Sequence, residues 1–241
     1  MIVVAGNRFD KAVQCLVERW KSYGAVLLTS EDLSTPGWRH YPDAIERSCA
    51  VLGGRVIRVP EIACVLTIMN AVFEQELIQI VASDRAYVAA EMTAFLRSWL
   101  SGLPCSVLNR PSATSLCGGP GWSREQWTIA AARLGIPVRQ VQRRAILAGV
   151  ASSCAEDADA VCVSVVGNHC FLPGLRAPDP WLACQALRLA QAAQVEFLAV
   201  QFSSPQQGSR FLSANLCPDA SDAELTEAIR VHLLASRDGR L

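Results

Sequence analysis

The strongest constraint on the fold lies at the N-terminus, where two short apolar runs flank a helical pattern. Residues 2–5 are all apolar and predict a buried strand. A helix is predicted over 10–23, because its apolar residues recur at i, i+3, i+4 and i+7. Gly24 is a typical helix end, and 25–29 is apolar again. Strand, helix and strand with short connections form a parallel pair, so we expect an α/β fold.

The remaining chain alternates between further strand and helix patterns. Gly-Gly and Gly-Asn turns between apolar runs predict two hairpins, and a third surrounds a Ser-rich loop. Residues 30–43 are rich in Pro, Gly and Ser and predict a loop. The other expected strands are 49–52, 55–59, 62–69, 105–108, 161–166, 169–172, 197–202 and 210–216, and the other expected helices are 83–101, 123–134, 179–193 and one that begins near Ser221.

The composition limits the class of partner. The chain of 241 residues carries 22 basic and 22 acidic side chains, without a basic run or an acidic tail. This balance favours neither a nucleic acid nor an anionic membrane as partner. No segment approaches the roughly 18 apolar residues of a membrane span, and no charged leader of a signal peptide precedes the first apolar run. We therefore expect a cytoplasmic protein.

The ten cysteines do not predict a metal centre or a disulfide framework. They are widely scattered, without a CxxC pair or a Cys/His cluster of zinc spacing. Reduced thiols packed as small hydrophobic side chains are expected instead. His169-Cys170 raises the question of nucleophilic catalysis, but no nucleophile elbow of the GxSxG kind is present. The segment Cys117–Gly121 precedes a helix, yet it is neither a P-loop nor GxGxxG, and a linker is the favoured interpretation.

Three segments carry a family resemblance. The first ends a strand in an Asn-x-Pro turn (CSVLNRP, 105–111), and the second ends a helix in a Gly-Ile-Pro step (WSREQWTIAAARLGIPV, 122–138). The third, 159–218, contains a strand hairpin, a helix and two further strands. These segments and their order resemble the ATP-grasp superfamily, in its branch of glutamate-type ligases and ribosomal-peptide maturases. The resemblance implies a parallel-sheet, pre-ATP-grasp-like domain over 1–120 and a reduced ATP-grasp-like α+β lobe over 121–241.

The chain departs from the family where ATP would be held. In the family, a whole subdomain with lysine contacts to the nucleotide follows the Gly-Ile-Pro step, whereas only 139–160 fill that interval here, without a lysine. The helix start where a further phosphate-binding lysine is common reads Ser123-Arg124. Lys11 and Lys21, the two lysines of the chain, lie off the apolar stripe of the first helix, where a solvated surface position is expected. The resemblance therefore implies a truncated scaffold without a nucleotide cofactor.

The metal positions of the family are also altered. Family ligases present an Asp on one strand and Glu-x-Asn on the next. Matching these strands places Gln201 and Ser213 at the two carboxylate positions, and only Asn215 keeps its identity. Because Mg²⁺ depends on one or two carboxylates together with phosphate oxygens, we expect no metal here. Arg124, Gln201, Ser213 and Asn215 are then vestigial positions of a lost nucleotide site.

Possible contacts with a ligand or partner are aromatic and basic residues. Arg and aromatic side chains dominate interface hot spots. Burial of the loop tryptophan against its own domain, and a solvated helix face for the arginines near the shortened interval, are the alternatives that the sequence leaves open. The candidate contacts are Trp38, Arg39, Arg110, Arg139, Arg143 and Arg144.

These observations favour a non-catalytic binding or partner subunit in a biosynthetic, peptide-modifying pathway. Phosphoryl transfer depends on positive charge and positioning around the phosphates, and both are lacking at the matched positions. Removal of a subdomain exposes apolar surface, so we expect a protein or peptide partner or a homo- or hetero-oligomer. The alternative is an enzyme: a divergent ATP-grasp ligase, or a repurposed one, that a partner protein completes.

Overall fold

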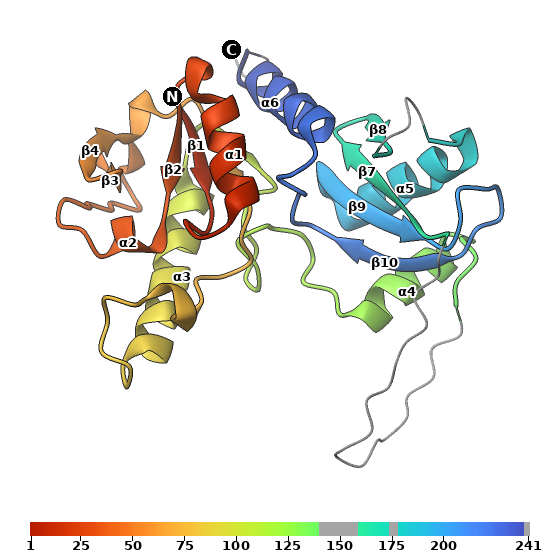
Figure 1. Ribbon diagram of the computed structural model, residues 1–241, viewed down its shortest axis with the longest axis horizontal. Coiled ribbons are helices and arrows are strands. Elements are labelled where there is room, and N and C mark those ends of the chain that lie inside the picture. The colour runs from red at the N-terminus through yellow and green to blue at the C-terminus, as the bar shows by residue number, and fades with distance from the viewer. Residues whose placement is uncertain (140–158, 174–177, 239–241) are drawn as a thin grey trace.

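The computed structural model describes residues 1–139, 159–173 and 178–238 of the chain. Two lobes lie side by side, and the C-terminal helix runs across the top between them (Figure 1). The N-terminal lobe is built on a parallel sheet, and the C-terminal lobe on an antiparallel one. The predicted α/β fold, with a parallel-sheet domain followed by an α+β lobe, is thereby confirmed.

The parallel sheet of the N-terminal lobe has the strand order β2-β1-β5-β6. A separate two-stranded hairpin, β3–β4, turns at Gly53-Gly54 as predicted. The elements of this lobe are β1 (Ile2–Ala5), α1 (Lys11–Arg19), β2 (Ala25–Leu28), α2 (Ser30–Leu33), β3 (Cys49–Leu52), β4 (Arg55–Arg58), β5 (Cys64–Thr67), α3 (Arg85–Gly102) and β6 (Ser106–Leu108), with 3-10 turns at Lys21–Tyr23, Ile45–Arg47, Val59–Glu61 and Glu74–Glu76.

The antiparallel sheet of the C-terminal lobe has the order β10-β9-β7-β8. Its elements are α4 (Arg124–Arg133), β7 (Val161–Val166), β8 (His169–Phe171), α5 (Pro180–Ala193), β9 (Phe197–Phe202) and β10 (Phe211–Asn215), followed by α6 (Ala223–Asp238). Side chains alternate along each strand, so one face of this sheet packs with α4 and α5 in an apolar core that includes Val163, Val200 and Phe202. The other face carries more polar side chains, among them Gln201 and Ser213.

The two lobes share a hydrophobic core. Helices α1 and α6 cover one face of the parallel sheet, with Leu16 and Ile229 both fully buried there. Val166 and Phe197, from the antiparallel sheet, belong to the same cluster. The last helix therefore packs on the N-terminal sheet, although it follows the C-terminal lobe in sequence. The other face of the parallel sheet packs on α3 in a second cluster.

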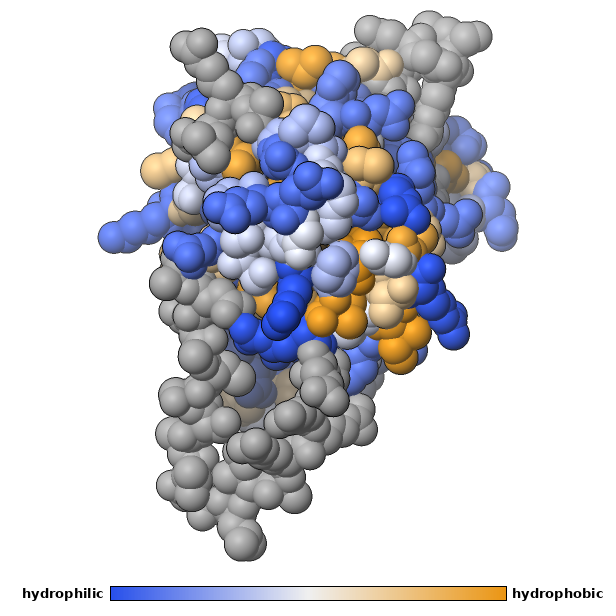
Figure 2. Space-filling view, turned by 90° about the vertical axis from the view of Figure 1, so that its right-hand side faces the viewer, coloured by the Kyte–Doolittle hydropathy of each residue, from blue (hydrophilic) through white to orange (hydrophobic). Residues whose placement is uncertain are grey.

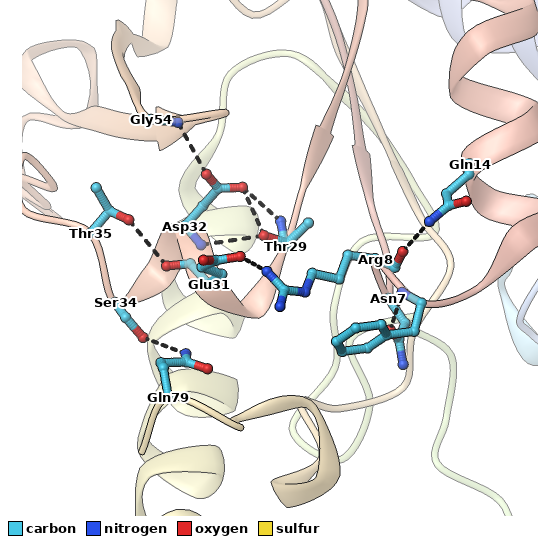
Figure 3. Close-up of polar contacts among 11 residues, drawn as sticks. Asn7, Arg8, Gln14, Thr29, Glu31, Asp32, Ser34, Thr35, Gly54 and Gln79 are labelled. Atoms are coloured by element: carbon cyan, nitrogen blue, oxygen red, sulfur yellow. Dashed lines mark hydrogen bonds and ion pairs between the residues drawn. The ribbon is translucent and has the colours of Figure 1, made fainter.

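The prediction of a loop over 30–43 is wrong at its start. Residues 30–33 form α2, because Thr29 and Asp32 make a capping box: the Thr29 hydroxyl accepts from the Asp32 amide, and the Asp32 carboxylate accepts from the Thr29 amide. Figure 3 shows this pair beside Glu31, which forms an ion pair with Arg8. The capping signal was outweighed by the Pro, Gly and Ser content of the residues that follow.

The candidate linker at 117–121 is tightly packed. Gly118, Gly119 and Gly121 all have positive φ angles of 66–74°, which favour glycine. A Cβ atom on Gly118 would lie 2.3 Å from the Arg110 carbonyl oxygen, and one on Gly119 would lie 2.4 Å from Leu216 Cδ1. Glycine is therefore required here by close packing between the end of β6 and the end of β10.

Candidate functional site

The candidate site is a pocket of about 570 Å³ that both lobes line. We call it the inter-lobe pocket. From the N-terminal lobe it is lined by Asp10, Ala12 and Ile68, and from the polar face of the antiparallel sheet by Cys162, Ser164, Ala199, Gln201, Ser213 and Asn215. The segment that leads into α6 completes it with Cys217, Pro218, Asp219, Ala220, Asp222 and Leu225, and Pro173 also contributes.

The parallel sheet places its part of the pocket by topology. The chain leaves β1 toward β2 on one side and returns through β5 on the other, so the order of strands reverses between β1 and β5. Asp10 follows β1, and Ile68 follows β5, at the carboxyl ends of these strands. Open parallel sheets bind ligands outside the carboxyl ends of the strands at such a reversal. The pocket therefore lies where an α/β sheet offers a crevice.

The antiparallel sheet places its part by alternation. Ser213 is the register partner of Gln201, and Gln201 is the partner of Cys162, so these three side chains share one face across β10, β9 and β7. Asn215 and Ser164 flank Ala199 in the same way. The vestigial positions Gln201, Ser213 and Asn215 are thus brought together. Arg124, at the start of α4, is exposed and does not line the pocket.

The predicted metal positions do not fit a magnesium ion. The Ser213 hydroxyl donates to Gln201 Oε1 over 2.9 Å, and Asn215 Oδ1 accepts from the Cys217 amide over 3.0 Å. The donor set at the three matched positions is neutral, and its members are already hydrogen-bonded. Within 1–139, 159–173 and 178–238, no group of three His, Cys, Asp or Glu side chains is placed to hold a metal. A hard divalent cation would lack its carboxylates at these positions.

The charged side chains that line the pocket are all acidic. Asp10 and Asp222 are helix caps: one carboxylate oxygen of each accepts from two backbone amides at the starts of α1 and α6. Asp219 accepts from the amide and hydroxyl of Ser221. No lysine, arginine or histidine of the described residues is among the lining side chains. Three carboxylates without a cation disfavour a polyphosphate and favour a neutral or cationic group.

The basic residue nearest to Asp10 in the loop after β1 is directed elsewhere. Arg8 forms an ion pair with Glu31 of α2, and its guanidinium carbon lies 4.7 Å from the centre of the Phe9 ring. Figure 3 shows the Arg8 side chain extending toward Glu31 and Thr29, away from Gln14 on α1. Lys11 is exposed and does not line the pocket. Lys21 is also exposed and forms an ion pair with Glu18, with 3.1 Å between Lys21 Nζ and Glu18 Oε1.

Two thiols of the pocket differ in acidity. Burial raises the pKa of Cys162, and the nearby Asp219 carboxylate adds to this rise. A hydrogen bond from the Cys117 thiol lowers the pKa of Cys217, against the opposing effects of burial and of Asp10 and Asp219. The Cys117 pKa is raised, because its proton is held in that bond and the thiol is buried. Cys162 is therefore a protonated thiol at neutral pH and a poor nucleophile.

None of the predicted contact residues in the described part of the chain lines the pocket. The Trp38 indole donates to the Asp32 carbonyl oxygen over 2.8 Å. It also packs edge-on against Trp99 of its own lobe, with 5.4 Å between the ring centroids. Arg110 donates to the carbonyl oxygens of Leu103 and Cys105 just beyond the end of α3. Arg39 and Arg139 are exposed. Arg143 and Arg144 lie outside the described residues, as does most of the interval in which the missing subdomain is predicted.

The acidic residues of the pocket were not among the predicted site residues. A signal for Asp10 was present, since it follows the first strand of a predicted parallel sheet, at the edge where such sheets bind ligands. Asp219 and Asp222 come from the segment after β10, and only the path of α6 back to the N-terminal sheet brings them to Asp10.

Searches against protein-family models and against curated proteins find no match. Solved structures do match over nearly the whole chain. The macrocyclase MdnC from Microcystis aeruginosa MRC, bound with precursor peptide MdnA, has a TM-score of 0.68 at 13% identity, covering 97% of this chain and 99% of that chain.

A second match is a Chryseobacterium gregarium RiPP-associated ATP-grasp ligase in complex with ADP and a leader and core peptide. It has a TM-score of 0.64 at 11% identity, covering 100% of this chain and 99% of that chain. The ATP-grasp ligase PsnB with minimal precursor has a TM-score of 0.61 at 13% identity, covering 96% and 98% of the two chains. The predicted resemblance is confirmed at the level of the fold: this chain has the fold of the ATP-grasp ligases.

Proposed function

We propose that this chain is a non-catalytic protein of the ATP-grasp fold that binds a peptide in the inter-lobe pocket. It would act as a binding or partner subunit in a peptide-modifying biosynthetic pathway. The observation that carries the proposal is the chemistry of the pocket. Gln201 and Ser213 are neutral where the resemblance implies carboxylates, and the charged lining side chains, Asp10, Asp219 and Asp222, are all acidic.

The absence of a built nucleotide site within the described residues supports the non-catalytic part. Binding of ATP needs cations or backbone amides directed at the phosphates, and usually a magnesium ion. The amides at the starts of α1 and α6 are capped by Asp10 and Asp222, so these helix ends present carboxylates to the pocket. A polyphosphate entering here would meet negative charge from both lobes.

The peptide part is supported by the solved relatives and by the polar face of the sheet. Matching structures include a macrocyclase bound with a precursor peptide and a ligase with leader and core peptides. In the inter-lobe pocket, Ser164, Gln201, Ser213 and Asn215 offer hydroxyl and amide groups that suit the amides of a peptide backbone. Its volume of about 570 Å³ is within the range of small-ligand sites and accommodates a few residues.

A selection from random peptides tests this proposal. A library of ten-residue peptides is selected on the native chain and counter-selected on an Ala199→Trp variant, in which an indole fills the pocket. A matched control, Ala192→Trp, places the same side chain at an exposed position on α5. The proposal predicts peptides retained by the native chain and the control but lost by Ala199→Trp. Equal retention by all three proteins, or no enriched peptide, would contradict it.

A further inference from the structure

Two cysteines from different lobes are in contact where Cys217 lines the inter-lobe pocket. Cys117 follows β6 and contacts the end of β5 in the parallel sheet, whereas Cys217 follows β10 of the antiparallel sheet. The Cys117 thiol is in hydrogen-bonding contact with that of Cys217. Both are free thiols in this structure.

Cys117 is held in place and shielded from solvent. Its residue is 1% exposed, and its sulfur lies 3.5 Å from the Thr67 carbonyl oxygen and 3.3 Å from that of Met69. Thr67 is the last residue of β5 in the parallel sheet, and Met69 follows two residues later. The neighbouring Gly118 packs against the Asn109–Arg110 backbone and fixes the path of the chain. A reagent in solvent therefore has no direct access to this thiol.

Cys217 is the accessible member of the pair, since it lines the inter-lobe pocket. Its backbone amide is fixed by Asn215 Oδ1 over 3.0 Å. The close approach of Gly119 to Leu216 holds the two cysteine-bearing segments against each other, independently of the thiols. Cys217 is thus an outer thiol that can react with a reagent in the pocket, and Cys117 is an inner thiol in contact with it.

We propose that Cys117 and Cys217 form a reversible disulfide that joins the two lobes. The oxidant is a small-molecule disulfide such as oxidised glutathione. The Cys217 thiolate attacks one sulfur of the reagent, and a mixed disulfide forms as the first glutathione thiolate leaves. Cys117 attacks Cys217 Sγ and gives its proton to the second glutathione thiolate as that group leaves. In total, two protein thiols are oxidised and one glutathione disulfide is reduced to two glutathione molecules.

The bond would link segments 100 positions apart in sequence, on opposite sides of the lobe boundary. It would also withdraw the Cys217 sulfur from the wall of the pocket toward Cys117. Oxidation would therefore fix the relation of the lobes and change the pocket in one step. This consequence does not depend on which ligand the pocket takes.

The test is peptide mapping of the full chain after incubation with oxidised glutathione. A Cys15→Ser/Cys184→Ser background removes the exposed thiols of the described residues. The expected product is a cross-linked tryptic pair with a mass lower by two hydrogen atoms. Fragment ions must assign the bond to Cys117, because Cys105 is on the same tryptic peptide. Dithiothreitol should restore both thiols.

Two variants separate the steps. In Cys117→Ser, Cys217 should accumulate a stable glutathione adduct, because no inner thiol is present to displace it. In Cys217→Ser, Cys117 should stay reduced at the same dose, because it is buried. A lasting glutathione adduct at Cys217 of the background chain, without the cross-link, would overturn the proposal. So would oxidation of neither cysteine after prolonged incubation.

Discussion

Replacement of Asn109 by alanine should weaken the junction between the lobes. The Asn109 side chain is buried at the end of β6, and its amide group donates to the Phe197 carbonyl oxygen over 2.9 Å. Its Oδ1 accepts from the amides of Glu196 and Phe197 over 3.0 and 2.9 Å. Strand β10 pairs with β9 only as far as Asn215 and Ala199. Asn109 therefore takes the place of a strand partner for the first residue of β9.

The magnitude follows from these three bonds. A net contribution of about 1 kcal/mol each gives a loss of about 3 kcal/mol in the free energy of unfolding. The loss cannot be recovered by solvation without opening the junction, because Phe197 is fully buried. Surface substitutions change the free energy of unfolding by less than about 0.5 kcal/mol. Gln191→Ala, at an exposed position on α5, is the matched control.

Urea unfolding followed by tryptophan fluorescence measures both variants against the native chain. Hydrogen exchange at the Phe197 amide gives a local readout, and exchange should become faster in Asn109→Ala alone. A loss below about 1 kcal/mol, with unchanged protection of Phe197, would refute the reasoning. It would mean that the side-chain amide does not act as the missing strand partner.

Three further predictions concern pH, charge and association. Burial raises the pKa of Glu76 in the folded chain. Its contribution to the free energy of unfolding is therefore favourable below the unfolded pKa of 4.5 and is lost as pH rises through the folded pKa. In urea titrations, Glu76→Gln should raise the free energy of unfolding by about 1 kcal/mol at pH 8, and by less at pH 5. In NMR titrations at low salt, the peptide Ac-Ala-Lys-Ala-NH2 should bind about 3- to 10-fold more tightly than Ac-Ala-Glu-Ala-NH2, and the difference should shrink in high salt. Equal affinities would contradict the preference of the acidic pocket for cationic groups, but not peptide binding itself. Phe73 and Val81, near the start of α3, are 53% and 71% exposed, so the native chain should sediment as an oligomer. The Phe73→Ser/Val81→Ser variant should shift toward monomer, whereas Val56→Ser on β4 should not. A native chain that sediments as a monomer would count against association.

The apolar surface of the C-terminal lobe is more limited. Figure 2 shows a largely hydrophilic face with an apolar area in its lower half. Among the described residues of this lobe, Ile129 on α4 is an exposed large apolar side chain, at 51%. No helix in the described part of the chain is long and apolar enough to cross a membrane.

Local sequence patterns predicted most elements because each has a local physical cause. The βαβ unit at the N-terminus follows from two apolar runs and a helix between them, and the Gly53-Gly54 and Gly167-Asn168 turns define their hairpins. Polar alternation in β9 and β10 also brought Gln201, Ser213 and Asn215 to one face, as the matched strands implied. These features need only neighbours in sequence or a register of two residues.

The rest of the site depends on contacts between distant segments. Asp219 and Asp222 reach Asp10 because α6 packs back on the parallel sheet, and no local pattern encodes that path. Cys117 and Cys217 also meet only at the junction of the lobes, through segments that are distant in sequence. Tryptophan is common at interfaces, yet the Trp38 indole packs on Trp99 and donates to the Asp32 carbonyl oxygen within its own lobe. Residue type alone does not distinguish these uses.

The most direct test of the non-catalytic account is calorimetric titration of the purified chain with ATP and Mg²⁺, with ADP release measured in parallel. The Gln201→Asp/Ser213→Glu variant, which places the two carboxylates implied by the family, serves as the comparison. The account predicts no saturable heat and no ADP from the native chain. Micromolar binding of ATP, or ADP formation above the uncatalysed rate, would contradict it and show that the neutral residues of the pocket do not exclude the nucleotide.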